Sequence, residues 1–216
     1  YRDNHNSAKP KTYNFEPSYD PEIRPYACCE MMGGMMCSYK YRFHLDLRAI
    51  DALANIKLGS GCNLLGYYMY HGGTNPEGKL STLQESRATG YPNDLPVLSY
   101  DFNAPLREYG QISDTWRRIR MLSYFVHDFE DPLCRSRYIE QPGNAADADD
   151  YTSLRTAVRC GSGDEPAGFF FVNNYQRRRE MAEHKAAQLR AYGEDGGTVL
   201  EDFGTQDIKN GDSFFY

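Results

Sequence analysis

The sequence lacks the features of several protein classes. It has 24 Lys and Arg residues against 30 Asp and Glu residues, so its formal net charge is −6. There is no basic excess to neutralise nucleic-acid phosphates or an anionic membrane surface. No segment approaches the roughly 18 consecutive apolar residues that a membrane span needs. We therefore expect neither a nucleic acid nor a membrane as a partner.

Cysteine is scarce, and its spacing does not suit a metal site. The chain has six cysteines and no C-x-x-C pair. The adjacent Cys28 and Cys29 cannot easily serve one tetrahedral centre, and His71 has no cysteine at ligand spacing. We interpret the cysteines mostly as small buried apolar residues rather than ligands or disulfide partners. No metal and no cofactor are expected.

The chain also shows no signal peptide. It begins at Tyr1 rather than Met and ends on "GDSFFY". We interpret it as an internal segment of a longer protein. The compartment stays open, with a secreted or periplasmic location among the alternatives.

Tyrosine is abundant, with 18 Tyr against 11 Phe and one Trp. A tyrosine side chain combines an apolar face with a hydroxyl, which suits polar ligands such as sugars but equally suits half-buried positions. The sequence predicts a loop over residues 1–24, a strand over 25–29, a helix over 45–61 capped by Asp46, and a strand over 63–70. This order predicts a βαβ unit with parallel strands, whose ligands lie beyond the C-terminal strand ends.

The remaining chain changes character after about residue 130. A strong amphipathic pattern predicts a helix over 113–129, whose apolar face includes Leu122 and Met121. Residues 130–150 are rich in Pro, Asp, Gly and Ala and are interpreted as a linker. A hairpin of "TAVRC" and "FFFVNNY" then indicates a second, β-rich domain, although propensity alone favours a helix over 177–192.

Glu30 is the sharpest candidate for a chemical role. It follows the first predicted strand among apolar and small neighbours, where an unpaired carboxylate is costly unless it is used. The structural alternative is an ion pair with an arginine such as Arg24 or Arg42.

Two further groups of side chains follow strand ends. Tyr68, Tyr70 and His71 could bind a ligand through hydroxyl and imidazole groups, or the tyrosines could pack under the neighbouring helix. Tyr100 follows another strand in "SYDF", and Asp101 could hold its loop by capping a backbone N–H group.

Three motifs together resemble glycoside hydrolase family 35, the β-galactosidases. They are "PYACCEMMGGM", "YYMYHGGTN" and "SYDFNAPLREYG", in the family's order and spacing, and the resemblance covers residues 22–128. The resemblance implies an α/β fold: residues 1–129 would be the C-terminal part of a (β/α)8 TIM barrel, about its last two strands and helices. Residues 130–150 would be a linker and 151–216 the start of a β-sandwich-like domain. Residues 177–192 would then be strands.

The resemblance also implies roles for individual residues. Glu30 resembles the nucleophile of a retaining enzyme, in which two carboxylates lie only about 5–5.5 Å apart. Tyr68 resembles the tyrosine beside that nucleophile, and Tyr100 one that lines the galactose pocket. Tyr70, His71 and Met35 are the other candidates for substrate binding. The implied partner is a terminal β-galactoside, in an oligosaccharide or polysaccharide.

Three departures from the family pattern stand out. Met35 replaces a tryptophan, and Phe102 replaces the second tyrosine of "SYDY". The motif of the proton donor does not precede Glu30, so we expect residues 1–216 alone to be inactive. The competing interpretation is a non-catalytic carbohydrate-binding or interaction module, which has no need of a carboxylate such as Glu30 at a barrel strand end.

Overall fold

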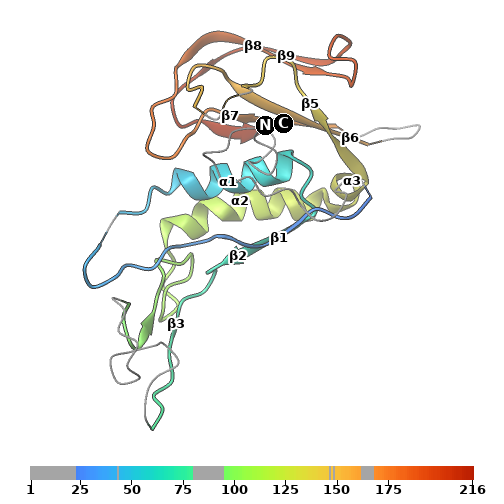
Figure 1. The fold of residues 1–216 in the computed structure, drawn as a ribbon. Helices are drawn as coiled ribbons and strands as arrows, with labels where there is room; N and C mark the ends of the chain where they lie inside the picture. The colour runs from blue at the N-terminus through green and yellow to red at the C-terminus, as the bar shows by residue number, and fades with distance from the viewer. Residues whose placement is uncertain (1–22, 43, 80–94, 146, 148, 162–167) are drawn as a thin grey trace.

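A computed structural model describes residues 23–42, 44–79, 95–145, 147, 149–161 and 168–216. In Figure 1 the elements lie in layers. The helices α1 and α2 lie between a pair of strands, β1 and β2, and a four-stranded sheet, which a hairpin of β8 and β9 covers on its far side. The predicted loop over residues 1–24 lies almost entirely outside the described residues.

The first part of the chain forms the predicted βαβ unit. Strand β1 (Ala27–Met32) pairs in parallel with β2 (Leu64–Tyr68), and α1 (Arg48–Gly59) connects them. Strand β1 runs two residues beyond Glu30, so this side chain lies near the strand end rather than after it. The register of the two strands shifts between Cys28 and Met31, and Glu30 lies within that irregularity.

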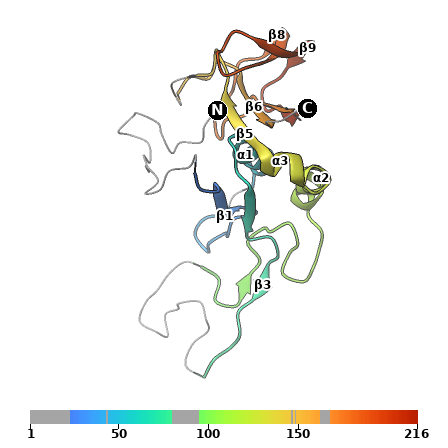
Figure 2. The ribbon, with the colours of Figure 1, turned by 90° about the vertical axis from the view of Figure 1, so that its right-hand side faces the viewer.

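Helix α1 is buried on more than one face because it is packed between two layers. Ile50, Ala54 and Leu58 are buried as their spacing predicts. The helix begins later than predicted, at Arg48, and its N-cap is Leu47, so the prediction of Asp46 as the cap is wrong. The Asp46 carboxylate still accepts a hydrogen bond from the Arg48 backbone N–H group, 3.1 Å away. Figure 2 shows α1 end-on between the strands and the upper sheet.

A long connection follows β2 and leads to the second helix. Within it, β3 (Gly73–Thr74) and β4 (Ser99–Tyr100) form a short antiparallel pair. Helix α2 (Asp114–Asp128) begins where predicted, since the Ser113 side chain accepts a hydrogen bond from the Trp116 N–H group. Its Leu122 is buried, whereas Met121 is 65% exposed and does not belong to the apolar face.

Residues 130–140, which the composition indicated as linker, form regular structure instead. Helix α3 (Glu130–Arg135) follows α2 directly, and β5 (Ser136–Glu140) pairs antiparallel with β6 (Arg155–Gly161). The apolar residue Leu133 is buried in the same core as α1 and α2. Polar composition was misleading here because an edge strand and a short helix need few apolar residues.

The predicted hairpin is confirmed. Strand β6 pairs antiparallel with β7 (Gly168–Asn173), and β10 (Ser213–Phe215) and β5 complete a sheet in the order β10-β7-β6-β5. The continuous apolar run in β7 has a simple cause. Phe169 and Phe171 point into the core shared with the helices, whereas Phe170 and Val172 point into a second core.

The propensity-based helix over 177–192 is wrong, and the strands implied by the family resemblance are confirmed for part of it. Residues His184–Tyr192 form β8, which pairs with β9 (Val199–Ile208). Leu189 and Ala191 are buried, two positions apart, and pack with Phe170 against the sheet. Burial of that alternating pair outweighs the weak helix preference of the segment.

A buried arginine links the βαβ unit to the sheet. Arg159 of β6 is fully buried, and its guanidinium donates hydrogen bonds to carbonyl groups on three elements. The acceptors lie at the C-terminal end of α1, where Leu58 and Cys62 are, and around α3, at Leu133 and Ser136. The carbonyl groups at the end of α1 carry partial negative charge, which partly compensates the buried cation.

The cysteines are less buried than predicted. All six are free thiols, yet only Cys62 is buried, while Cys29 and Cys134 are exposed. Cys29 and the following Glu30 are both exposed. Within the described ranges no helix is long and apolar enough to cross a bilayer.

Candidate active site

Two glycines allow three chain segments to meet beyond β1. A Cβ atom on Gly33 would lie 2.3 Å from the carbonyl oxygen of Met69, and one on Gly34 would lie 2.4 Å from that of Phe102. The Gly33 N–H group also donates a hydrogen bond to the Tyr68 carbonyl, 3.0 Å away. The absence of side chains therefore brings the segment after Glu30 against the ends of β2 and β4.

Two tyrosine hydroxyl groups meet where these segments converge. The hydroxyl oxygens of Tyr68 and Tyr100 lie 2.6 Å apart, within hydrogen-bond distance. Both rings also contact Phe102, with centroid separations of 5.5 Å and 4.7 Å. Tyr68 is 38% exposed, so it does not pack beneath the helix. Its neighbour Tyr67 takes that place, in contact with the core.

The charge of Glu30 is felt at one of these hydroxyl groups, that of Tyr100. The pKa of Tyr100 is raised to about 12, first by the hydrogen bond with Tyr68, then by burial and the Tyr68 charge, and also by the negative charge of Glu30. The expected ion pair of Glu30 with Arg24 or Arg42 is not found among the described residues. The three residues that the motifs singled out thus come together from three separate segments.

A partly buried network of hydrogen bonds around Asp101 fixes the loop that carries Tyr100. The carboxylate of Asp101 accepts hydrogen bonds from the Arg107 Nε group at 2.7 Å and from the backbone N–H groups of Glu108 and Asn103 at 3.0 and 3.2 Å. Against the cost of burial, these bonds lower the pKa of Asp101. The predicted capping role of Asp101 is therefore confirmed.

The same network holds an unusual backbone conformation. Phe102 and Asn103 have φ values of 57° and 50°, in the left-handed region that non-glycine residues seldom adopt. Such positions cost roughly 1–3 kcal/mol each and persist where the surroundings impose them. Here the bonds to Asp101 impose the turn, which presents the Phe102 ring to both tyrosines.

A second carboxylate, that of Glu108, links the neighbouring strands β3 and β4. It accepts hydrogen bonds from the Thr74 hydroxyl group of β3 and from the Ser99 hydroxyl group of β4, the latter at 2.7 Å. Gly72 lies beside it, because a Cβ atom there would be 3.0 Å from the Glu108 backbone nitrogen and 2.7 Å from the Asp101 carbonyl oxygen. Of the glycine pair after His71, Gly72 therefore serves a close approach, whereas a Cβ atom on Gly73 would meet nothing within 4 Å.

A cavity of about 280 Å³ opens next to Phe102. Its lining comes from the segment after β1 and from the β4 loop: Met36, Cys37, Ser38, Tyr39, Arg42, Pro96, Ser99, Asp101, Phe102, Asn103 and Arg107. Sequence reasoning gave none of the first five of these residues a role in binding, and it named Arg42 only as a candidate ion-pair partner of Glu30. Only their position in the sequence could have indicated a role, since they follow a strand whose end was already assigned to the site.

The other predicted binding residues lie around this centre without joining it. Met35 is 40% exposed, and its carbonyl oxygen accepts a hydrogen bond from the Asn103 side chain at 2.9 Å, but it does not line the cavity. The Tyr70 ring contacts Tyr67, with centroids 6.1 Å apart. The His71 Nδ1 atom contacts the neighbouring Gly72 carbonyl group. Their roles in binding stay predictions.

Comparison with known families agrees with this geometry. A family model described as glycosyl hydrolases family 35 matches residues 2–125, which is more than half of the chain. The matched region contains β1, α1 and β2 and nearly all of α2, together with the convergent residues Glu30, Tyr68 and Tyr100. The chain belongs to glycosyl hydrolase family 35.

Proposed function

We propose that the chain supplies the nucleophile half of a retaining β-galactosidase, with Glu30 as the nucleophile. The convergence of Glu30, Tyr68 and Tyr100 at adjacent strand ends carries the proposal. Membership of the family implies a TIM-barrel catalytic domain. The parallel β1–α1–β2 unit is the unit from which such barrels are built, and its C-terminal strand ends are where their active sites lie. We propose that β1 and β2 are barrel strands seven and eight.

In this mechanism the Glu30 carboxylate attacks the anomeric carbon of a terminal β-galactoside. A covalent glycosyl-enzyme intermediate forms as the glycosidic bond breaks, and water then releases the sugar with retained configuration. Glu30 is exposed and has no ion-pair partner among the described residues, so it is available for this attack. This role explains why a carboxylate is exposed on β1.

The two tyrosines would act as neutral hydrogen-bond donors. The raised pKa of Tyr100 keeps its hydroxyl group protonated at neutral pH. One of the two hydroxyl groups donates to the other, and the second proton is left to reach Glu30 or a hydroxyl group of the sugar. Such a donor would orient the Glu30 carboxylate for attack.

The mechanism needs a second carboxyl group that protonates the leaving oxygen. The carboxylates of the loop that carries Tyr100 are already committed: Asp101 to Arg107 and two backbone N–H groups, and Glu108 to two hydroxyl groups. A depressed pKa also makes Asp101 a poor proton donor at neutral pH. We propose that the acid lies outside residues 1–216, and that these residues alone are therefore inactive.

The test uses the full-length protein that carries this chain and an aryl β-galactoside. Glu30→Gln should lower kcat by several orders of magnitude, because an amide cannot form the covalent intermediate. Glu201→Gln is the matched control: Glu201 is an exposed residue of β9, and its replacement should leave kcat unchanged. If Glu30→Gln keeps a tenth of the wild-type rate, Glu30 is not the nucleophile.

A second readout separates a missing nucleophile from a damaged fold. In Glu30→Gly, azide can enter the space of the lost carboxylate and attack the same carbon. This reaction should restore turnover and yield the α-galactosyl azide, whose configuration is opposite to that of the substrate. A carbohydrate-binding module would instead bind galactose without any turnover in the wild type.

A further inference from the structure

We propose that the cavity beside Phe102 binds an anionic group, a carboxylate or sulfate, on the sugar to which the galactosyl residue is linked. The inference rests on the proposed function, because it assigns the leaving half of the substrate to a cavity that shares Phe102 with the tyrosine pair. Arg42 would bind the anion, and Tyr39 would support it with a hydroxyl donor.

The position of the cavity suits the leaving half of a substrate. Phe102 both lines the cavity and contacts the rings of Tyr68 and Tyr100, so one side chain separates the cavity from the tyrosine pair. A volume of about 280 Å³ is at the lower end of the roughly 300–1,000 Å³ of ligand pockets. That size suits a single sugar unit better than a long chain.

The charges in the lining favour an anion. The cavity is lined by one carboxylate, that of Asp101, and by two guanidinium groups, those of Arg42 and Arg107. Asp101 and Arg107 neutralise each other through an ion pair. The lining therefore keeps one net positive charge, which belongs to Arg42.

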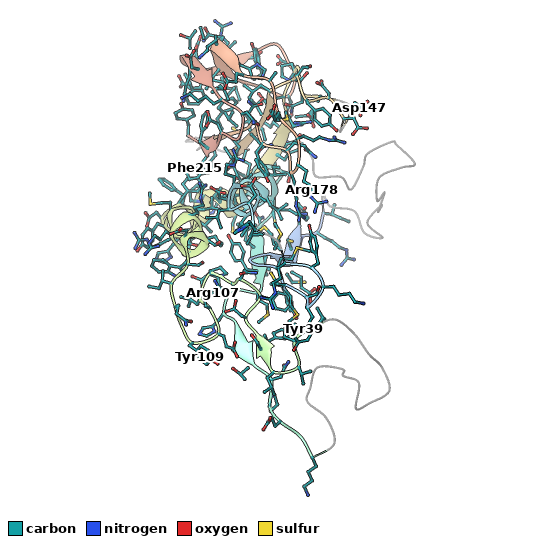
Figure 3. The ribbon with its side chains drawn as sticks, turned by 90° about the vertical axis from the view of Figure 1, so that its left-hand side faces the viewer. Tyr39, Arg107, Tyr109, Asp147, Arg178 and Phe215 are labelled. Atoms are coloured by element: carbon teal, nitrogen blue, oxygen red, sulfur yellow. The ribbon has the colours of Figure 1, made fainter. Side chains whose placement is uncertain are left out.

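Two hydrogen-bond donors of the lining are available to a ligand. Neither the Arg42 guanidinium nor the Tyr39 hydroxyl group forms a hydrogen bond or ion pair with any other residue in the described ranges. The remaining polar groups have protein partners: Ser99 donates to Glu108, and the Asn103 side chain donates to the Met35 carbonyl group. Figure 3 shows Tyr39 and Arg107 at the same end of the molecule, beside the β3–β4 pair.

The chemistry of a guanidinium group explains why an anion is expected rather than a neutral sugar alone. Its fork of N–H donors matches the two oxygens of a carboxylate or sulfate, and such charge-assisted bonds are about twice as strong as neutral ones. Neighbouring Asp101 would repel the anion if its charge were free. Its ion pair with Arg107 neutralises this charge and so removes the repulsion.

The experiment compares kcat/KM of the full-length protein for three substrates: phenyl, 4-carboxyphenyl and 4-sulfophenyl β-D-galactoside. Arg42→Gln should lower kcat/KM for the two anionic substrates by about tenfold, the effect of one charged hydrogen bond in a partly exposed site. It should leave phenyl β-D-galactoside within a factor of two. The sulfonate of the third substrate stands in for a sulfate, and preference for the carboxylate or the sulfonate then distinguishes the two sources of charge.

Arg117→Gln is the matched control. Arg117 is an exposed arginine of α2, paired with Asp114, and does not line the cavity. Its removal changes the net charge of the protein by the same amount and should affect no substrate. Raising the salt concentration should also reduce the wild-type preference for anionic substrates, because salt screens an exposed charge.

The outcomes separate this inference from the proposed function. Hydrolysis of phenyl β-D-galactoside with an equal Arg42→Gln effect on all three substrates would overturn the anion site and leave the galactosidase intact. Failure of the wild type to hydrolyse any of the three would overturn the proposed function itself. A loss of kcat/KM confined to the anionic substrates is the result that supports the inference.

Discussion

The hydroxyl oxygens of Tyr68 and Tyr100 lie 2.6 Å apart, although their strands do not pair with each other. Tyr68 ends β2, which pairs with β1, whereas Tyr100 ends β4, which pairs with β3. The contact therefore depends on loops rather than on a sheet ladder. It links the strand end beside Glu30 to a loop fixed some 30 residues later by Asp101.

Removal of either hydroxyl group should impair turnover without unfolding the protein. We expect Tyr68→Phe and Tyr100→Phe each to lower kcat/KM for an aryl β-galactoside by about tenfold or more, since each loses a positioned hydrogen bond. The double variant should lose much less than the product of the two effects, because both changes break one shared bond. Losses that multiply fully would show that the two hydroxyl groups act independently.

The same pair gives a prediction for pH. The pKa of Tyr100 is about 12, above its ordinary value of 10, so the hydroxyl group stays protonated through the alkaline range in which enzymes are assayed. We therefore expect any fall of kcat/KM between pH 8 and 10 to occur at about the same pH in the wild type and in Tyr100→Phe. If the alkaline fall of kcat/KM disappears in Tyr100→Phe, the pKa of Tyr100 lies below about 12.

Local patterns predicted the part of the molecule in which local and tertiary preferences agree. The helical spacing of Ile50, Ala54 and Leu58 and the serine cap at Ser113 gave correct helices. Three motifs located Glu30, Tyr68 and Tyr100, but no local pattern could show that the hydroxyl groups touch. That contact depends on backbone approach at Gly33 and Gly34, which is visible only when the segments are assembled.

Other features escaped because distant residues decide them. Residues 184–192 favour a helix locally, but β9 offers them a full set of strand partners, and Leu189 becomes buried only against the sheet. Cys29 is exposed in a part of β1 where the register with β2 is irregular, which its small apolar side chain could not reveal. Arg42 and Tyr39 carry no sequence signal of their own, and only the cavity gives them a candidate role.

Asp101 should stabilise the folded protein in a pH-dependent way. Its pKa is lowered on folding, so its contribution is present above its ordinary value of 3.8 and is lost as the pH falls through the lower folded value. We expect Asp101→Asn to reduce the free energy of unfolding by about 1–2 kcal/mol at pH 7, the size of a partly exposed charged network.

Denaturant unfolding at several pH values tests this expectation. The difference between wild type and Asp101→Asn should shrink below about pH 4, where the Asp101 carboxylate of the unfolded chain begins to be protonated while that of the folded protein is still ionised. Asp114→Asn is a suitable comparison, since Asp114 forms an ion pair on the surface of α2 and should change stability little. A difference that stays constant down to pH 2 would contradict the assigned role.

Arg159 should be among the most sensitive positions in the fold. Replacement by Leu would leave several buried carbonyl groups without donors, at the end of α1 and around α3. We expect a loss of about 3 kcal/mol or more in the free energy of unfolding. Arg159→Lys should restore only part of it, because an ammonium group cannot reproduce the planar fork of donors. Equal stability of the two variants would show that charge and fork are irrelevant there.

The glycine pair after β1 offers a prediction with an internal control. Alanine at Gly33 or Gly34 would place a Cβ atom 2.3 or 2.4 Å from a backbone carbonyl oxygen, so the chain itself must move. Each change should cost about 2–3 kcal/mol of stability and lower kcat/KM at least tenfold, because the segment after Glu30 is pushed away from Tyr68 and Phe102.

A Cβ atom at Gly73 would meet nothing within 4 Å, and this residue has no positive φ. Gly73→Ala should therefore leave stability within about 0.5 kcal/mol of wild type. Denaturant unfolding and kcat/KM of the three variants, measured in the full-length protein, test the idea together. If Gly33→Ala and Gly34→Ala behave like Gly73→Ala, close backbone approach is not what brings Glu30 to the tyrosine pair.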